Sequence, residues 1–433
     1  MRPYASATTR MRAYIAYAEA IPQAMENIRA NLAGPLPRTY VDLGRTVFGG
    51  LAKFYEQYAP EAFASVQDEK LVARFKTANA GAIAAARALD TWLESRRSTA
   101  GDDFALGSER FSEMLRASEQ LDVSIDRLEQ LGRDDLDRNR AALGEACATF
   151  APGKTVNDCV AVIQARKPNP GPVEVASDQL PELRRFVENQ QLVTIPGGEE
   201  AQLIEAPPQL RWNPAGIILS GGLERRDVPS FYYVTPADAS WNEAERKAYI
   251  VDVESLRIIS VHEVWPGHFL HSQHAYRAPS VLARIFWNNC TSEGWAHYTE
   301  EMMVDAGLGS TDGGETRIAQ LLQALVRNVR FLSAIGLHTG RMSLADSEQM
   351  FREKAFYDSA GARQQAARGT FDPAYLDYTL GKLMIRKLRE DWTSTRGGRD
   401  AWHAFHDEFL SYGAPPIPLV RAAMLGPDAG PPL

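Results

Sequence analysis

Long apolar runs and an excess of positive charge are both missing from this chain of 433 residues, and each absence excludes a class of protein. No stretch approaches the roughly 18 consecutive apolar residues that a membrane-spanning helix needs. The formal net charge is −8, and no basic stripe is present that could neutralise phosphates. The sequence therefore predicts neither a membrane span nor a nucleic-acid partner.

Cysteine is also scarce, with three residues in the whole chain. Cys147, Cys159 and Cys290 cannot all pair with one another, and their spacing fits no zinc-ribbon pattern. We therefore expect buried free thiols, with a Cys147–Cys159 bridge as the less favoured alternative. Cys290 is close to Glu293 in sequence, but we expect it to pack in the core rather than to act as a nucleophile.

Histidine, in contrast, is concentrated in one region, since five of the eight histidines lie between residues 262 and 297. The run from Ser260 to His271 reads SVHEVWPGHFLH, and a second run from Ser292 to Glu300 reads SEGWAHYTE. Neutral imidazoles and a carboxylate are the ligands that a catalytic zinc prefers, with one position left open for water. The two runs therefore predict the site of a zinc hydrolase.

The first run cannot bind zinc from a straight helix. The common zinc-peptidase motif places its two histidines four residues apart, but Pro266 occupies that position here. At about 100° per residue, His262 and His268 would point about 120° apart on an undistorted helix. Pro266 removes one hydrogen bond to the carbonyl of His262, and Gly267 tolerates the backbone that follows. We expect a widened turn that swings His268 back towards His262.

Glu293, which opens a second predicted helix, is the expected third ligand. Two helices that each offer ligands near one end can pack antiparallel around one ion. Glu263 then binds no metal, but takes a proton from the zinc-bound water and later delivers it to the leaving amine. His297 lies one turn beyond Glu293 and can orient it. His271 and His274 are expected to line the cleft or to support the ligands from behind.

A structural reading of the same residues is the alternative. A single histidine on a helix more often packs in the core than binds metal, and a Pro-Gly pair often marks the end of a helix. The glutamate beside His262 and the Glu-Gly-Trp segment that follows at a helix-hairpin distance favour the metal site.

At these residues the chain resembles a known family. The pattern His-Glu-x-x-Pro-Gly-His, followed by Glu-Gly-Trp-Ala-x-Tyr-x-Glu, is similar to that of the bacterial proteins grouped as domain of unknown function 885. The resemblance covers nearly the whole chain and implies a helical zinc metallopeptidase, akin to thimet-type oligopeptidases. It implies one zinc ion held by His262, His268 and Glu293, with Glu263 as the general base. Many members carry a second histidine after Pro-Gly-His, where this chain has Phe269.

The N-terminal segment lacks the features of a secretory signal peptide. Residues 13–24 are interrupted by Glu19 and Pro22 and are typical of an amphipathic helix. Taken alone, this predicts a cytoplasmic protein. Members of the family are usually longer at this end and many are exported, so a missing leader would make the protein exported or periplasmic.

Length and periodicity predict a mainly helical protein in two lobes, because single cores rarely grow beyond about 300 residues. Apolar residues recur at helical spacing over residues 68–97 and 111–150, which predicts a helical N-terminal lobe over residues 1–166. Residues 167–433 form the expected catalytic lobe. Its parts are a sheet at about 191–236, metal-binding helices at about 241–306, C-terminal helices at about 315–411 and an extended tail from Gly413.

Four short β-prone runs, bounded by proline and glycine, make up the expected sheet. We interpret them as a small antiparallel sheet near the active-site cleft, whose edge can align an extended peptide by strand addition. The alternative is that the sheet only covers a face of the core. The runs are 191–195, 202–206, 216–220 and 231–235.

A zinc peptidase also needs a donor that stabilises the tetrahedral oxyanion, typically a tyrosine, histidine or arginine that faces the metal. The candidates are His338, Arg368 and Tyr378, and the preference for them rests in part on the family's later motifs. Tyr232 and Tyr233 in the β-prone region are rivals. Arg368 and Tyr232 are also expected to bind substrate, although a buried tyrosine with a satisfied hydroxyl is the structural alternative.

Together these features predict a two-lobed, zincin-like metallopeptidase of the gluzincin type that cleaves short peptides with Glu263 as general base. Two alternatives stay open. One is a non-catalytic helical protein that is stabilised by metal and binds a partner, and the other is a hydrolase of a non-peptide amide or ester. No motif indicates a particular oligomeric state.

Overall fold

The computed structural model describes residues 4–207, 210–211, 213–237 and 242–433. Within these residues the chain is mainly helical and carries one small sheet, which confirms this part of the predicted fold class. None of the described helices is both long enough and apolar enough to cross a bilayer. The chain divides into two compact units, unit 1 with Met1–Phe104 and Ala206–Asn213, and unit 2 with Ala105–Glu205 and Pro214–Leu433.

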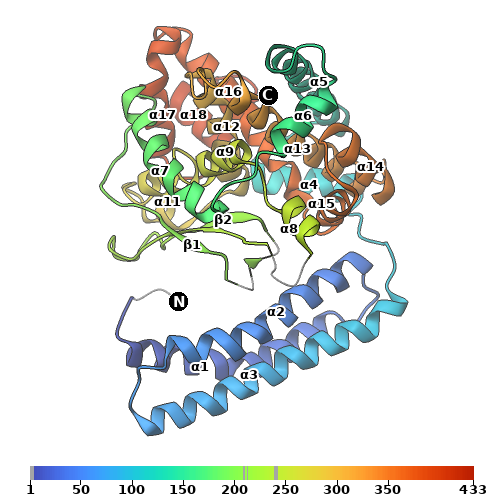
Figure 1. Cartoon of the computed structure of the whole chain (residues 1–433), viewed down its shortest axis with the longest axis vertical. Helices are drawn as coiled ribbons and strands as arrows, with labels where there is room; N and C mark the ends of the chain where they lie inside the picture. The colour runs from blue at the N-terminus through green and yellow to red at the C-terminus, as the bar shows by residue number, and fades with distance from the viewer. Residues whose placement is uncertain (1–3, 208–209, 212, 238–241) are drawn as a thin grey trace. The chain divides into compact units, whose positions relative to one another are not determined.

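Unit 1 is built from long helices that pack side by side (Figure 1). They are α1 (Ala7–Asn31), α2 (Arg38–Ala62) and α3 (Glu69–Arg96), followed by the short η1 (Arg97–Thr99). Asp68 caps α3, because its side chain accepts a hydrogen bond from the N–H of Leu71. The helices share a core of their own around Tyr55, Phe63 and Phe75. The helix predicted at residues 68–97 is confirmed.

Unit 2 contains the sheet and the other described helices. Before the sheet come α4 (Ser108–Glu119), α5 (Ile125–Phe150), α6 (Val156–Gln164) and α7 (Pro172–Asn189). The sheet is followed by α8 (Glu243–Tyr249), α9 (Val253–Glu263), α10 (His268–Ala275), α11 (Val281–Ile285), α12 (Asn289–Asp305) and α13 (Glu315–His338). The C-terminal part has α14 (Leu344–Lys354), α15 (Ser359–Phe371), η3 (Pro373–Leu376), α16 (Asp377–Thr393), η4 (Gly398–Ala401), α17 (Trp402–Ser411) and α18 (Ile417–Leu425).

The division between the units falls after Phe104, whereas the sequence predicts it near residue 166. The difference arises because α5 packs along α13, deep in unit 2. At their contact, Gly132 lies so close to Phe331 that a Cβ would overlap the ring. Periodicity shows which face of a helix is apolar, but it does not show which other helix covers that face.

Two predicted element boundaries differ from the structure. The helical span expected over 111–150 is broken, because Gln120 has a left-handed φ of 55° and Ser124 caps the start of α5. The tail expected to be extended from Gly413 contains α18, since a proline in the first turn is compatible with a helix. Trp241, at the start of the region predicted to hold the metal-binding helices, lies outside the described residues.

The sheet has three strands, β1 (Gln202–Glu205), β2 (Ala215–Ile218) and β3 (Phe231–Val234), in the order β1-β3-β2. β3 pairs antiparallel with β2 but parallel with β1, so the predicted antiparallel sheet is wrong for β1. β1 and β2 do not pair with each other, because β3 lies between them in the sheet. The run 191–195 forms no strand, and Gln191, its first residue, has a positive φ of 48°.

The expectation of three free thiols is corrected by a disulfide between Cys147 on α5 and Cys159 on α6. The two helices are joined by a short turn, and their packing brings the Cα atoms of the two cysteines within 5.8 Å. A spacing of twelve residues along the chain cannot reveal this. Cys290 is a buried free thiol, as predicted.

Candidate metal centre

The first histidine run does not form one continuous helix. α9 ends at Glu263, the Trp265–Pro266 peptide bond is cis, and α10 begins at His268. The predicted widened turn is therefore corrected to a complete break between two helices. Proline supplies the reason, because it has no N–H to continue the hydrogen-bond ladder of α9. The break lets the two histidines approach each other from separate helices.

Gly267 and Trp295 hold this break in place. The N–H of Gly267 donates to the carbonyl of Val261 at 3.0 Å, and a Cβ at position 267 would overlap the carbonyl of His262. Only glycine permits so close an approach of the backbone to itself. The indole N–H of Trp295 on α12 donates to the carbonyl of Pro266 at 2.9 Å. Trp295, from the second run, thus stabilises the backbone at the break in the first run.

The position of α12 is set by its cap and by close packing against α16. Asn288 caps the helix, because its side chain accepts a hydrogen bond from the N–H of Thr291 at 2.8 Å. Gly294 of α12 meets Gly381 of α16, and a Cβ on either residue would overlap the backbone of the other helix. These contacts place Glu293, in the first turns of α12, against the ends of α9 and α10.

The structure brings the three predicted ligands together. Nε2 of His262 lies 3.2 Å and Nε2 of His268 lies 3.3 Å from the same atom, Oε2 of Glu293. One ligand atom from each residue lies within 4.8 Å of the other two. Two imidazoles and one carboxylate are a donor set that zinc accepts, with a fourth position free for water or substrate. The residues therefore fit a single divalent ion.

Glu300 contacts the ring nitrogen of His262 that faces away from Glu293. Oε1 of Glu300 lies 2.7 Å from Nδ1 of His262, which leaves Nε2 facing Glu293. A carboxylate in this position fixes the ring orientation and tautomer of a metal-binding histidine. Seven residues, or about two helical turns, separate Glu293 from Glu300, so their common face could have been read from the sequence.

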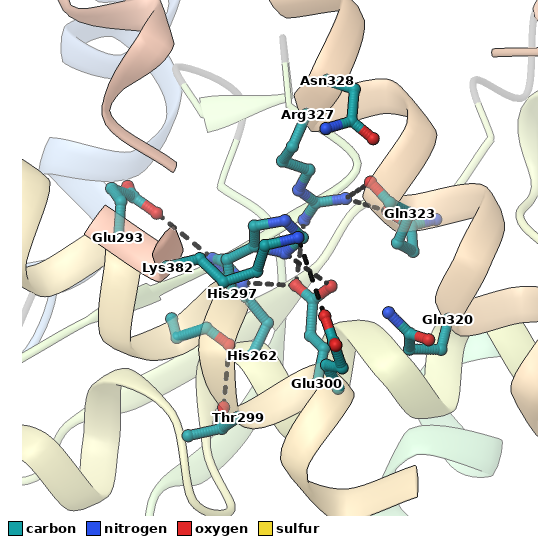
Figure 2. Close-up of polar contacts among 12 residues, drawn as sticks. His262, Glu293, His297, Thr299, Glu300, Gln320, Gln323, Arg327, Asn328 and Lys382 are labelled. Carbon is teal, nitrogen blue, oxygen red and sulfur yellow. Dashed lines mark hydrogen bonds and ion pairs between the residues drawn. The ribbon is translucent and has the colours of Figure 1, made fainter. Parts of the chain in front are cut away.

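Glu300 is itself held by His297 and Arg327. Its Oε2 lies 3.1 Å from Nδ1 of His297, and its Oε1 lies 3.4 Å from Nη2 of Arg327 (Figure 2). Burial alone would raise the pKa of Glu300, but Arg327 and His297 outweigh it and keep this pKa below its ordinary value. His297 therefore orients Glu300, whereas the sequence predicts that it orients Glu293. Arg327 lies on α13, and no spacing links it to α12 in the sequence.

The cluster is open to solvent on one side. The side chain of His262 is 6% exposed, while those of His268 and Glu293 keep 12% and 20% exposure. Oγ of Ser292 lies 3.2 Å from Nδ1 of His268 and so leaves its Nε2 for the cluster. A small ligand can therefore approach the cluster from the side of His268 and Glu293.

Glu263 is the partly exposed carboxylate that directly follows His262. Burial raises its pKa above the ordinary value, against the opposing effect of His262 and His268. A carboxyl with a raised pKa takes up a proton more readily than one with the ordinary pKa. Glu263 therefore lies beside the cluster as a carboxyl with a raised pKa.

Tyr378 and Arg368 lie beside the cluster. The ring of Tyr378 is nearly parallel to that of His262, with centroids 6.3 Å apart. Nη2 of Arg368 donates to the hydroxyl of Tyr378 at 3.3 Å. Burial raises the pKa of Tyr378, which keeps its hydroxyl protonated and able to donate. Both residues were selected from the sequence, and the structure brings both to the site.

His338 and Tyr232 do not join the cluster. His338 ends α13 about 16 Å along the helix from Arg327, and its Nε2 lies 2.9 Å from the carbonyl of Gly369. The predicted catalytic role of His338 is corrected to a buried structural one. Tyr232 is fully buried with its hydroxyl 3.1 Å from Oγ of Ser260, so it packs β3 against α9 instead of meeting substrate.

His271 and His274 also turn away from the ligands. Nε2 of His271 lies 3.1 Å from the carbonyl of Gly413, and burial lowers the pKa of His271 to about 3. Nε2 of His274 lies 2.8 Å from the carbonyl of Thr194. These histidines attach α10 to neighbouring segments, so neither lines the opening of the cluster as expected. Phe269, next to His268, is buried against Trp265.

The fold and the site define a mainly helical protein with a candidate centre for one divalent ion, built from two histidines and a glutamate. The chain belongs to the family described as bacterial protein of unknown function (DUF885), whose profile matches residues 1–424. The resemblance stated from the two sequence runs is thereby confirmed at the level of the family.

Two solved structures share this fold. A candidate lipoprotein of unknown function from Shewanella oneidensis is 24% identical with a TM-score of 0.75, and the match covers 96% of this chain and 78% of that one. A candidate lipoprotein from Colwellia psychrerythraea is 17% identical with a TM-score of 0.78, and covers 96% and 75%. A search of curated proteins found no match. These similarities establish the fold alone.

Proposed function

We propose that this protein is a zinc-dependent metallopeptidase that hydrolyses short peptides. The observation that carries the proposal is the convergence of His262, His268 and Glu293, with Glu263 directly beside them. The two-lobed, zincin-like arrangement expected from the sequence is part of the same proposal. Zinc bound by this donor set supplies a Lewis acid and an activated water.

The residues around the cluster have distinct roles in this proposal. Glu263 accepts a proton from the attacking water and returns it to the leaving amine, a task that its raised pKa favours. Tyr378, whose hydroxyl is held by Arg368, donates a hydrogen bond to the oxyanion. Glu300 keeps Nε2 of His262 directed at the ion.

Two measurements test the proposal. The purified protein is expected to hold one zinc per chain, determined by elemental analysis, and to cleave members of a peptide library. A chain that takes up no zinc refutes the ligand assignment. If the protein takes up zinc but hydrolyses no amide or ester, it is a metal-stabilised binding protein. If it hydrolyses non-peptide substrates alone, it is a hydrolase of a different class.

We further propose that the protein is exported. Disulfides such as Cys147–Cys159 persist in oxidising compartments and are rare in the cytosol. The two proteins of similar fold are described as candidate lipoproteins, and nothing in these findings supports the cytoplasmic expectation. After production through an export pathway, titration of the unfolded protein is expected to find one free thiol, that of Cys290, whereas three would contradict the bridge.

Glu300→Gln is expected to lower zinc affinity about 10- to 100-fold, because the amide holds the ring of His262 less well and leaves Arg327 without its carboxylate. Chelator competition measures the change. Glu390→Gln, at an exposed position of α16, serves as the control and should leave the affinity unchanged. Equal zinc affinities of the wild type and Glu300→Gln would show that Glu300 does not contribute to metal binding.

Zinc binding is expected to release a proton at neutral pH. Burial alone lowers the pKa of His262, but its hydrogen bonds with Glu293 and Glu300 outweigh burial and raise this pKa to about 9. Because zinc needs the neutral ring, the proton must leave His262 at any pH below about 9. Apparent affinity should therefore rise about tenfold per pH unit below that value. Calorimetry in buffers of different ionisation enthalpy counts the proton, and a count of zero contradicts the assignment.

A further inference from the structure

Two arginines and two tyrosines pack together next to the candidate metal centre. The guanidinium carbon of Arg330, on α13, lies 5.1 Å from the ring centroid of Tyr378 and 4.9 Å from that of Tyr375. The guanidinium carbon of Arg368, on α15, lies 4.7 Å from the Tyr375 centroid. Arg368 also donates to the hydroxyl of Tyr378. Both arginines therefore pack against the same two tyrosines. The four residues Arg330, Arg368, Tyr375 and Tyr378 form one group, which we call the platform.

The positive charge of this platform is not balanced. Arg368 has a carboxylate partner, because its Nη2 lies 3.1 Å from Oδ2 of Asp372. Nε of Arg330 donates to the amide oxygen of Gln365 at 3.0 Å, and within the part of the chain that is described no carboxylate forms an ion pair with Arg330. Two guanidinium groups thus face one carboxylate.

The contrast with Arg327 shows that this imbalance is specific to Arg330. Arg327 lies one turn earlier on α13, and its guanidinium pairs with Glu300 and bonds to Gln323. Arg330 is partly buried but has no such counter-ion in the described part of the chain. A partly buried cation without a counter-ion is costly, and a carboxylate from a ligand removes the cost through two parallel hydrogen bonds.

The platform is close enough to the metal centre to contact the same substrate. Tyr378 belongs to the platform, and its ring centroid lies 6.3 Å from that of His262. One residue of an extended peptide spans about 3.5 Å, and a hydrogen bond at either end adds about 3 Å. A peptide whose scissile carbonyl lies at the cluster can therefore reach the platform with the residue that follows. Arg368 keeps 24% of its side chain exposed and Arg330 is also partly exposed, so an anion has access.

We propose that Arg330 and Arg368 bind a carboxylate of the residue that follows the scissile bond. The inference rests on the peptidase function proposed above and narrows its substrates to peptides with an anionic group at that position. The carboxylate has two possible sources, the free α-carboxylate at the C-terminus of a peptide or an acidic side chain. The first source makes the enzyme a carboxypeptidase.

The test compares the binding of three matched peptides to the zinc-loaded Glu263→Gln protein, in which the proposed base is removed. The peptides differ only at the last residue, which has a free α-carboxylate in the first, a neutral amide in the second, and is an amidated glutamate in the third. Calorimetry is expected to show about 10- to 100-fold tighter binding of a peptide with the carboxylate than of the neutral amide. The peptide that is preferred identifies the source of the carboxylate.

Variants of the platform assign the preference to its arginines. Adding Arg330→Met is expected to remove the preference while zinc content stays at one ion, and adding Arg330→Lys should keep part of it because the charge remains. Arg330→Lys also serves as the second variant if the methionine destabilises the fold. Arg363→Met, at an exposed position of α15, is the matched control and should retain the full preference.

The outcomes separate the two proposals. Equal binding of the three peptides, or a preference that survives both changes at Arg330, overturns the carboxylate site. If peptide binding depends on Arg330 but the wild-type protein hydrolyses none of the peptides, the carboxylate site is supported and the peptidase function is refuted. Hydrolysis without any preference for a carboxylate supports the peptidase and refutes the site.

Discussion

Glu263→Gln is expected to lower kcat for peptide hydrolysis by about 10²- to 10⁴-fold while one zinc per chain remains bound. The amide has nearly the same size as the carboxylate, but it cannot accept a proton from the attacking water. Glu263 is not among the three residues whose donor atoms converge, so its replacement leaves His262, His268 and Glu293 in place. Loss of turnover with retention of zinc is therefore the signature of a general base.

The measurement pairs steady-state kinetics with elemental analysis of the same preparation. Glu188→Gln removes an exposed carboxylate on α7 and is expected to leave kcat and zinc content unchanged. Wild-type turnover by Glu263→Gln would show that another group accepts the proton. Loss of zinc from Glu263→Gln would instead place Glu263 among the ligands.

Gly267→Ala is expected to eliminate the metal centre and to lower the free energy of unfolding by about 3 kcal/mol or more. A Cβ at this position would overlap the carbonyl of His262, which is part of the rigid end of α9. The backbone can relieve the overlap only by moving α10 away from α9, and His268 moves with it. Zinc affinity and thermal stability are thus expected to fall together.

Gly144→Ala is the control for this substitution. Gly144 lies within α5, and no atom lies within 4 Å of a Cβ built at this position. Alanine favours a helix over glycine by about 1 kcal/mol, so the control should be as stable as the wild type or slightly more stable. Zinc titration and thermal unfolding compare the two variants. An alanine at position 267 that binds zinc normally would show that the break between α9 and α10 is not needed for the site.

The residues proposed to bind metal were selected from the sequence because their chemistry is concentrated in two short runs. A glutamate beside the first histidine and a Glu-Gly-Trp segment soon after it are both local features. The helical character of the chain is also local, since it follows from the spacing of apolar residues and from capping residues such as Asp68. The sequence predicts a distortion of the helix at Pro266, but not the complete break between α9 and α10.

The contacts that the sequence did not reveal join residues from different helices. Arg327 on α13 meets Glu300 on α12, and Cys147 on α5 meets Cys159 on α6. The parallel pairing of β1 with β3 likewise depends on the path of the chain between distant strands. For His338 the sequence suggests a role that the structure does not support. Histidine is suited to catalysis, but this one lies buried at the far end of α13.

The amino-acid sequence by itself determined the donor residues of the candidate centre, the residue beside them that is proposed to transfer a proton, and the helical class of the fold. Tertiary structure decided how the two histidines meet and which carboxylate supports His262. It also decided that Arg330 lies near the site with no ion-paired carboxylate among the described residues. The physical reason is that residue types and periodicity act over one or two helical turns. Distances between side chains on separate helices depend on close packing, as at Gly294 and Gly381, where each helix has room only for the backbone of the other.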